Sequence, residues 1–300
     1  MERARGETAL MAAEHGSTQG PGQARPFEVR KLARLDELHQ CEELQGRVWG
    51  PEDVVRVPAL VMVTSLGNGG FAFGAFGDGH LVGFVLASPG LTDTGHVKQC
   101  SVLMAVDPEW QNSGVGYRLK LAQREAALAQ GLDLITWTFD PLASANSHLN
   151  LQKLGCVASR YFVDLYGTAD RGLNAGLPTD RLLAEWWIRK PAVADRLANG
   201  HIEPPAAAPA IDEVASDPRT GLLTLDRMDL DRSEPVLLLE IPQSIRDIKL
   251  TDLELARAWR TGIREIFQHY FARGYRAAGF HRLPHNGRVR HCFLLEHVKE

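Results

Sequence analysis

Gln111 to Gly116 reads Gln-Asn-Ser-Gly-Val-Gly, and its residue types and spacing are suited to binding an anion. The apolar run Ser101 to Val106 precedes it and predicts a strand. Asp107-Pro108 ends that strand, because proline cannot donate to a ladder. A helix follows, in which Val115, Leu119, Ala122 and Ala126 share one face.

The order of strand, glycine turn and helix is suited to binding an anion at the start of the helix. The first backbone N–H groups of a helix have no partner inside it and lie at the positive end of the macrodipole. Glycines at 114 and 116 remove side chains that would block a ligand from these groups. The dipole contributes about 0.3–1 kcal/mol, whereas micromolar binding needs about 8 kcal/mol. A phosphate or pyrophosphate could therefore be anchored here, with the rest of the ligand bound elsewhere.

Two other phosphate motifs are excluded by the residues around the loop. Leu119 stands where the dinucleotide fingerprint has its third glycine. No Gly-Lys-Ser/Thr follows, so the loop is not a Walker motif. By itself the hexapeptide fits equally well a glycine turn that only packs a helix.

Met104 to Gly116 resembles motif A of the GNAT (Gcn5-related N-acetyltransferase) superfamily. The resemblance implies that the Gln-x-x-Gly-x-Gly loop holds the pyrophosphate of acetyl-coenzyme A and that the preceding strand pairs with the pantetheine arm. The coenzyme-binding residues that it implies are Met104, Ala105, Val106, Gln111, Asn112, Ser113, Gly114, Val115, Gly116, Tyr117 and Asn146. The family usually has basic residues near Asn112 and Ser113, and here Arg118 and Lys120 follow instead.

Hydrophobic periodicity predicts the elements on either side of this motif. The expected strands are Phe27–Leu32, Phe71–Phe76, Leu81–Ala87, Ser101–Val106, Leu134–Thr138, Cys156–Leu165 and Leu182–Ile188. The expected helices are Leu35–Val48, Val57–Leu66, the one from Val115 to Gly131, and Ala143–Leu154. This order predicts an α/β (α+β) class with a GNAT-like mixed, mostly antiparallel sheet flanked by helices.

Two further stretches, Thr136–Leu142 and Gly172–Arg181, resemble a bacterial subgroup of GNAT proteins whose substrates are unassigned. The second is longer than an ordinary hairpin loop, and such loops are often functional. A plain surface loop is the alternative.

Changes in composition divide the chain. Residues 1–25 predict a disordered tail, 26–189 an acyl-CoA-binding domain, and 190–218 a Pro/Ala-rich linker. Residues 219–300 predict a ββαββ half-domain, with strands at 222–225, 236–241, 275–280 and 289–295. A capping box, Thr251 to Glu254, is expected to open its long helix. Trp259 and Tyr270 on the apolar face of that helix predict that this region packs on the first domain.

Length, charge and cysteine content limit the classes of partner and compartment expected for this protein. The chain has 300 residues, 44% of them hydrophobic, and a net charge of −4, with a pI of 6.3. This balance argues against a nucleic-acid partner recruited by charge. Four scattered cysteines without a Cys-x-x-Cys pair fit reduced thiols in a cytoplasmic protein. No apolar run reaches membrane-spanning length, so no membrane partner is expected, and a homodimer is left open.

The acid and base expected from the resemblance are missing. The position of the family's usual base is occupied by Cys100, and that of its usual tyrosine acid by Leu151. Cys100 would need a lowered pKa to act as a nucleophile, and burial in a strand raises it. The substitutes are Asp140, at the end of a strand, and His148, on the next helix; His96 is a weaker candidate. A turn role for Asp140 and a packing role for His148 are the competing interpretations.

The candidate metal ligands in the sequence are His281, His285 and His291, because they lie close together along the chain. They span a turn with Pro284 and Gly287 and have no acidic partner in register, so we expect no metal site.

The sequence thus predicts an acyl-CoA-dependent acyltransferase that transfers acetyl from acetyl-CoA to the amine of a small molecule. The alternative is a non-catalytic module that binds acyl-CoA or a protein on a fold lacking the usual acid and base. The intact glycine loop favours the enzyme, and Cys100 with Leu151 favours the alternative.

Overall fold

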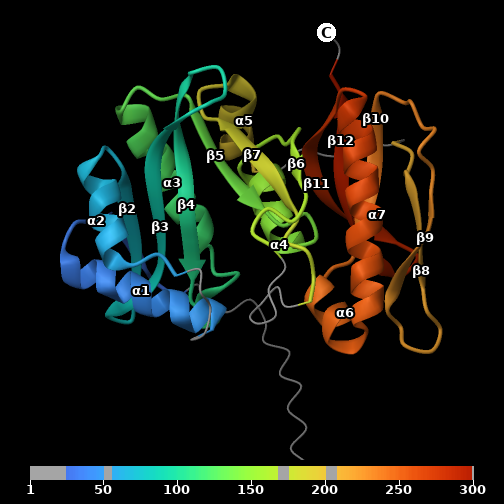
Figure 1. The fold of residues 1–300 in the computed structure, drawn as a ribbon, viewed down its shortest axis with the longest axis horizontal. Coiled ribbons are helices and arrows are strands. Elements are labelled where there is room, and N and C mark those ends of the chain that lie inside the picture. Colours follow the sequence, from blue (N-terminus) through green and yellow to red (C-terminus); the bar gives the residue numbers. More distant parts are fainter. Residues whose placement is uncertain (1–24, 51–55, 168–175, 201–207, 299–300) are drawn as a thin grey trace, which may run out of the picture.

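The structure is a computed structural model that describes residues 25–50, 56–167, 176–200 and 208–298. An N-terminal and a C-terminal sheet lie side by side, each with its own helices (Figure 1). The tail expected over residues 1–25 lies almost wholly outside the described residues. Residues 172–175 of the long loop and 201–207 of the expected linker lie outside them as well.

The described part of the N-terminal half forms a seven-stranded sheet with the order β1-β2-β3-β4-β5-β7-β6. The strands are β1 (Glu28–Leu32), β2 (Phe71–Gly77), β3 (His80–Leu91), β4 (Val97–Val106), β5 (Leu134–Phe139), β6 (Tyr161–Phe162) and β7 (Arg181–Trp187). Neighbouring strands are antiparallel except β4 and β5, which run parallel. The predicted mixed, mostly antiparallel sheet with flanking helices is confirmed.

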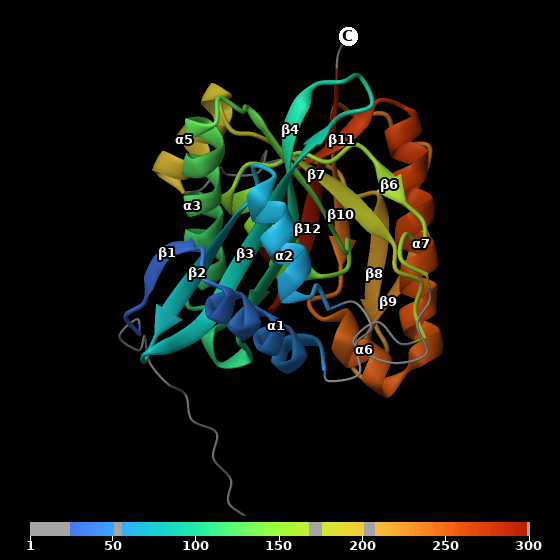
Figure 2. The ribbon, with the colours of Figure 1, turned by 60° about the vertical axis from the view of Figure 1, so that its left-hand side comes forward.

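Helices cover both faces of β2 to β4. On one face, α1 (Leu35–Trp49) and α2 (Ala59–Gly67) pack against Phe84 and Leu86. On the other face, α3 (Val115–Ala129) packs Leu119 against Val85. Figure 2 shows α1 and α2 in front of the sheet, with α3 beyond the strands. Burial on both faces explains why β3 is a continuous apolar run rather than an alternating one.

The pairing between β4 and β5 is short. Only Gln99 with Ile135 and Cys100 with Thr136 are in register. Just beyond, the β3–β4 register shifts so that Ser101 and Leu103 pair with consecutive residues of β3, which leaves Val102 as a bulge. A bulge bends a strand and increases its twist. The C-terminal half of β4 therefore diverges from β5, and no strand in the described part of the chain pairs with it on that side.

The C-terminal half has sheets of its own. A three-stranded sheet has the order β10-β12-β11, and β8 pairs with β9 in a second, two-stranded sheet. The elements are β8 (Asp212–Ser216), β9 (Leu223–Met228), β10 (Val236–Ile241), α6 (Ile245–Thr251), α7 (Leu253–Ala272), β11 (Tyr275–His285) and β12 (Arg288–His297). The predicted strands and long helix are found, but β9 pairs with β8 instead of joining the β10–β12 sheet.

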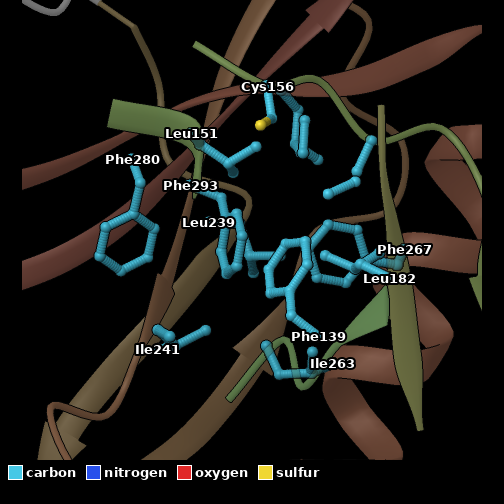
Figure 3. Packing of buried hydrophobic residues seen from close by; sticks show 14 of the residues in the cluster. Phe139, Leu151, Cys156, Leu182, Leu239, Ile241, Ile263, Phe267, Phe280 and Phe293 are labelled. Atoms are coloured by element: carbon cyan, nitrogen blue, oxygen red, sulfur yellow. The ribbon is translucent and has the colours of Figure 1, made fainter. Parts of the chain in front are cut away.

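One hydrophobic core joins the two halves. It packs Phe139 and Leu182 of the first sheet with Ile263 and Phe267 of α7, all buried (Figure 3). An isolated antiparallel bridge between Ala158 and Ala277 links the backbones. The expectation that the C-terminal region packs on the first domain is therefore confirmed.

Charged pairs cross the same interface. Arg260 of α7 donates from both terminal nitrogens to the carboxylate of Asp140, each at 2.7 Å. Arg264, one turn further, donates to both oxygens of the fully buried Asp180 at 2.8 and 3.0 Å. Bidentate geometry makes these the strongest kind of side-chain hydrogen bond.

Two predicted elements after β5 differ from expectation. The single helix expected over Ala143–Leu154 is α4 (Ser144–Ser147) followed by a π-helical turn, η2 (His148–Lys153). The strand expected over Cys156–Leu165 shrinks to β6. Ala158 pairs with the C-terminal sheet instead, and the left-handed φ of +46° at Asp164 turns the chain. Both differences come from tertiary contacts that local propensity does not contain.

The expected linker also contains structure. α5 (Pro191–Asn199) begins with proline in its first turn and ends at Gly200, whose φ is +73°. Arg196 of this helix donates to the carbonyls of Leu151 and Gln152 at 3.3 and 2.8 Å. With α5 and β8 in place, the linker interpretation is wrong for these residues, whereas the domain boundaries at 26–189 and 219–300 stay predictions.

The expected capping box is displaced by one residue. The N-cap of α7 is Asp252, whose carboxylate accepts from the Leu255 N–H at 2.9 Å. Thr251 instead ends α6, a helix that the sequence analysis did not predict.

We predict that Arg260→Met lowers the free energy of unfolding by about 3–5 kcal/mol, because it leaves the Asp140 carboxylate without its buried partner. The double variant Asp140→Asn/Arg260→Met removes both charges and should recover most of the loss. The pKa of Asp140 is lower in the folded protein than in the unfolded chain. The ion pair therefore contributes its full stabilisation of the fold above the unfolded pKa of about 4. This contribution is lost as the pH falls through the lower, folded pKa. Urea unfolding at several pH values measures this, and a single variant as stable as wild type would contradict it.

Candidate active site

The glycine loop is held rigidly between β4 and α3. The short turn η1 (Pro108–Trp110) follows β4 and buries Trp110. Ser113 Oγ donates to the Trp110 carbonyl at 2.5 Å, and Gln111 Nε2 donates to the Val106 carbonyl at 3.3 Å. Gly77 lies so close to the Trp110 ring that a Cβ there would clash. These contacts connect the loop to the end of β4 and pack its Trp110 against β2.

The start of α3 leaves backbone donors open. Gly114 is the N-cap in a left-handed conformation, with φ of +91°, and no described side chain caps the helix. The Arg118 N–H is the first to bond back, to the Gly114 carbonyl at 3.0 Å. The N–H groups of Val115, Gly116 and Tyr117 therefore have no partner within the helix. Open space surrounds the position where a Gly114 side chain would begin, so an anion can approach them.

Other predicted coenzyme residues gather around Gly116. A Cβ there would meet Met104 and Val106 of β4 and Leu149 of η2, all at 3.6–3.8 Å. Asn146 is exposed on α4, the element just before η2. Ala105, between Met104 and Val106, faces the opposite way, into the core beneath α1. Only the backbone of Ala105 is therefore available to a ligand on the α3 side.

The two basic residues after the loop have different environments. Arg118 is exposed. Lys120 is 1% exposed; its amine donates to Ser101 Oγ at 2.8 Å and Gln123 Oε1 at 3.1 Å and lies 3.5 Å from the centre of the Trp137 ring. Burial lowers the pKa of Lys120 to about 7. Lys120 therefore bridges β4 and β5 at their divergence and does not supply charge to the phosphates.

Both carboxylate oxygens of Asp140 accept hydrogen bonds. Besides the Arg260 pair, its Oδ1 accepts from the Leu142 N–H at 2.8 Å, and Arg181 lies 3.9 Å from Oδ2. Burial opposes the charged form, but the Arg260 guanidinium and these further contacts outweigh it and lower the pKa of Asp140. A carboxylate held in this way is a weak proton acceptor, so its contacts favour an interface role.

The other positions considered from the sequence are His148, Leu151, Cys100 and His96. His148 stacks edge-on against Phe280 of the C-terminal sheet, with ring centres 6.5 Å apart. Leu151 is fully buried in the core. Burial raises the pKa of the Cys100 thiol, which argues against a nucleophilic thiolate. His96 Nε2 lies 2.8 Å from Asp133 Oδ1 at the far end of β4.

The structure adds a cavity that the sequence analysis missed. It has a volume of about 430 Å³ and opens on the face of the sheet away from α3. Thr136, Lys98 and Glu185 line it, together with Arg160 and Trp187. Glu185 was detectable only as a polar residue within an otherwise apolar strand. A smaller cavity, of about 150 Å³, lies beside Tyr275 in the C-terminal half.

Comparison with known proteins finds one family match, within the N-terminal part of the chain. Residues 33–155 match the family model described as the acetyltransferase (GNAT) family. This part of the chain is therefore similar to GNAT-family acetyltransferase domains. The matched residues include the whole of β4, the glycine loop and α3. No curated protein matches the chain.

Solved structures resemble the GNAT domain at low identity. The ribosomal-protein-S18-alanine N-acetyltransferase from Escherichia coli is 16% identical with a TM-score of 0.43, and the match covers 55% of this chain and 96% of that one. An acetyltransferase of the GNAT family from Streptococcus pneumoniae is 18% identical with a TM-score of 0.42, covering 53% and 98%. An N-acetyltransferase from Staphylococcus aureus Mu50 is 13% identical with a TM-score of 0.44, covering 55% and 99%. Since these scores lie below 0.5, the assignment depends on the family model.

The described residues offer neither a metal site nor a membrane-spanning helix. No group of three His, Cys, Asp or Glu side chains there is placed to hold a metal ion. His291 of the histidine-rich turn instead has its Nδ1 2.7 Å from Ser144 Oγ. No helix in the described ranges is long and apolar enough to span a membrane.

We predict that Gly114→Glu weakens acetyl-CoA binding at least about tenfold, or ~1.4 kcal/mol, because it puts negative charge beside the open N–H groups of α3. Gly114→Asn is the matched control, since asparagine tolerates a left-handed φ and adds no charge. Calorimetric titration of both variants measures the effect. Equal affinity of wild type and Gly114→Glu would contradict a pyrophosphate site here.

Lys120 should impose a distinctive pH dependence on stability. Its folded pKa of about 7 lies below the unfolded value of about 10.4, so the unfolded chain binds more protons between these values. Stability should therefore rise with pH across this window, with the full cost of the buried charge present below it. Lys120→Met should lack this rise. Denaturant midpoints of the two proteins across the window test it, and parallel curves would contradict it.

Proposed function

We propose that this protein is an acyl-CoA-dependent acyltransferase that transfers acetyl from acetyl-CoA to an amine of a small molecule. The observation that carries the proposal is the open helix N-terminus beside a strand that has lost its neighbour. The first supplies donors for a pyrophosphate. The second supplies unpaired strand backbone for an extended, amide-containing arm.

The described residues fit coenzyme A in this arrangement. Backbone N–H groups at 115–117 would hold the pyrophosphate, with Arg118 exposed nearby. The C-terminal half of β4, which includes Met104 and Val106, would bind the pantetheine amides as an added strand does. The acyl end would then lie at the last β4–β5 pair, Cys100 with Thr136.

Direct attack by the amine fits this geometry better than a covalent intermediate. Cys100 is the thiol nearest the divergence, and burial raises its pKa. The neutral amine would attack the thioester carbon, while backbone N–H groups of the bulged strand stabilise the developing oxyanion. Asp140 and His148 stay sequence-based candidates for proton transfer, although their contacts favour structural roles.

We expect wild-type protein to release free coenzyme A thiol from acetyl-CoA when supplied with a suitable acceptor. The panel should contain amino acids, amino sugars, simple amines and short peptides, because a peptide N-terminus is also an amine. Gly114→Glu is the control for thiol release that does not use the loop. If thiol is released in the presence of a peptide but not of any small molecule, the acceptor is a peptide N-terminus instead of a small-molecule amine.

Tight acetyl-CoA binding without turnover of any acceptor would favour the non-catalytic alternative, a module that binds acyl-CoA or a protein. The cytoplasmic location and the homodimer considered from the sequence stay predictions.

A further inference from the structure

The 430 Å³ cavity begins where the proposed acyl end stops. Cys100 of β4 pairs with Thr136 of β5, and Thr136 pairs with Glu185 of β7, so the three residues form one row across the sheet. Thr136 and Glu185 line the cavity floor. Its volume falls within the 300–1,000 Å³ typical of small-molecule sites. Figure 1 shows β5 and β7 side by side beneath the β3–β4 turn.

Glu185 brings an uncompensated carboxylate into this cavity. It is half-buried on β7, and its backbone bonds to Val157 through an isolated bridge. No ion pair or side-chain hydrogen bond is found for its carboxylate among the described residues. A partly buried carboxylate without a cationic partner is costly unless a ligand supplies the charge. A substrate ammonium would supply it.

A cation lies across the cavity. Lys98 is on β4, two residues before Cys100, and has no ion-pair partner among the described residues. β4 and β7 are separated by β5, which puts their backbones about 10 Å apart. The flexible lysine stem spans part of that distance. The cavity therefore has a negative end at Glu185 and a positive end at Lys98.

The remaining charges at the rim are already paired. Arg160 donates to Asp93 at 3.0 Å, and His96 lies 2.8 Å from Asp133. All four side chains are well exposed, so these pairs contribute little and can rearrange. Trp187 adds an aromatic wall, with its ring 6.0 Å from that of His96.

We propose that this cavity binds the acceptor, a small molecule carrying both an amine and an anionic group, with Glu185 holding the ammonium and Lys98 the anion. The inference rests on the proposed acyltransferase function and names the substrate class for it. Cys100, at the family's usual base position, and Glu185 lie in the same row of the sheet, so Glu185 would act on the bound ammonium from β7 instead.

The chemical step balances with the groups present. Glu185 takes one proton from the ammonium, directly or through one water, and later releases it to solvent. The neutral nitrogen then forms a bond to the thioester carbon as the carbon–sulfur bond breaks. The nitrogen's second proton goes to the departing thiolate, which leaves as coenzyme A thiol. An amide and a free thiol are the products.

The experiment compares Glu185→Gln, Lys98→Met and the exposed-helix control Glu43→Gln with wild type. For an acceptor with both groups, Glu185→Gln should lower kcat by about 10²–10⁴ and leave acetyl-CoA affinity unchanged. Lys98→Met should raise KM about tenfold, ~1.4 kcal/mol, for amines with a carboxylate or phosphate but not for uncharged amines. Glu43→Gln should match wild type. Amino acids and amino phosphates run side by side identify which anion is bound.

Several results would overturn the proposal. Full activity of the Glu185→Gln variant would exclude Glu185 as the proton acceptor. Equal effects of Lys98→Met on amines with and without an anionic group would exclude an anion site at Lys98. Thermal melts of each variant check that the fold is intact. Titration of the same compounds into protein with coenzyme A bound tests the cavity independently of turnover. Absence of binding by every amine with an anionic group would refute the acceptor class, whereas binding without turnover would refute the acyltransferase function alone.

Discussion

The site depends on the loss of pairing between β4 and β5 after two residue pairs. A bulge at Val102 bends β4 away from its parallel neighbour, so the backbone of its C-terminal half has no partner on that side. Unpaired strand backbone inside a fold is costly unless something else bonds to it. The glycine loop lies at the diverging end and the cavity at the paired end, so a ligand threaded through the gap would connect them.

The C-terminal half stabilises the open end of this arrangement. Asp140 directly follows β5 and its carboxylate is held by Arg260, and Asp180 directly before β7 is held by Arg264. These bonds fix the two strands that lie beyond the divergence, where β4 cannot support them. The same contacts make Asp140 an anchor between sheets, which leaves a different carboxylate, Glu185, facing the open cavity.

Three buried or half-buried charged side chains lie on the two faces of the sheet near the point where β4 and β5 diverge. On the α3 side, Lys120 fills the space between Ser101 and Trp137 with an amine whose pKa burial lowers. On the opposite side, Glu185 and Lys98 line the 430 Å³ cavity. The first arrangement supports the strands, and the second leaves a carboxylate and an amine lining a cavity.

The sequence by itself determined the order of most elements in the N-terminal half and the position of its glycine loop, because hydrophobic period, proline and glycine act locally. It did not determine the roles of Asp140 and Lys120, whose partners lie 120 residues away on α7 and on two neighbouring strands. The π-helical turn and the short β6 likewise follow from packing against the C-terminal sheet. Only the tertiary structure aligned Cys100, Thr136 and Glu185 in one row, because strand register is a long-range property.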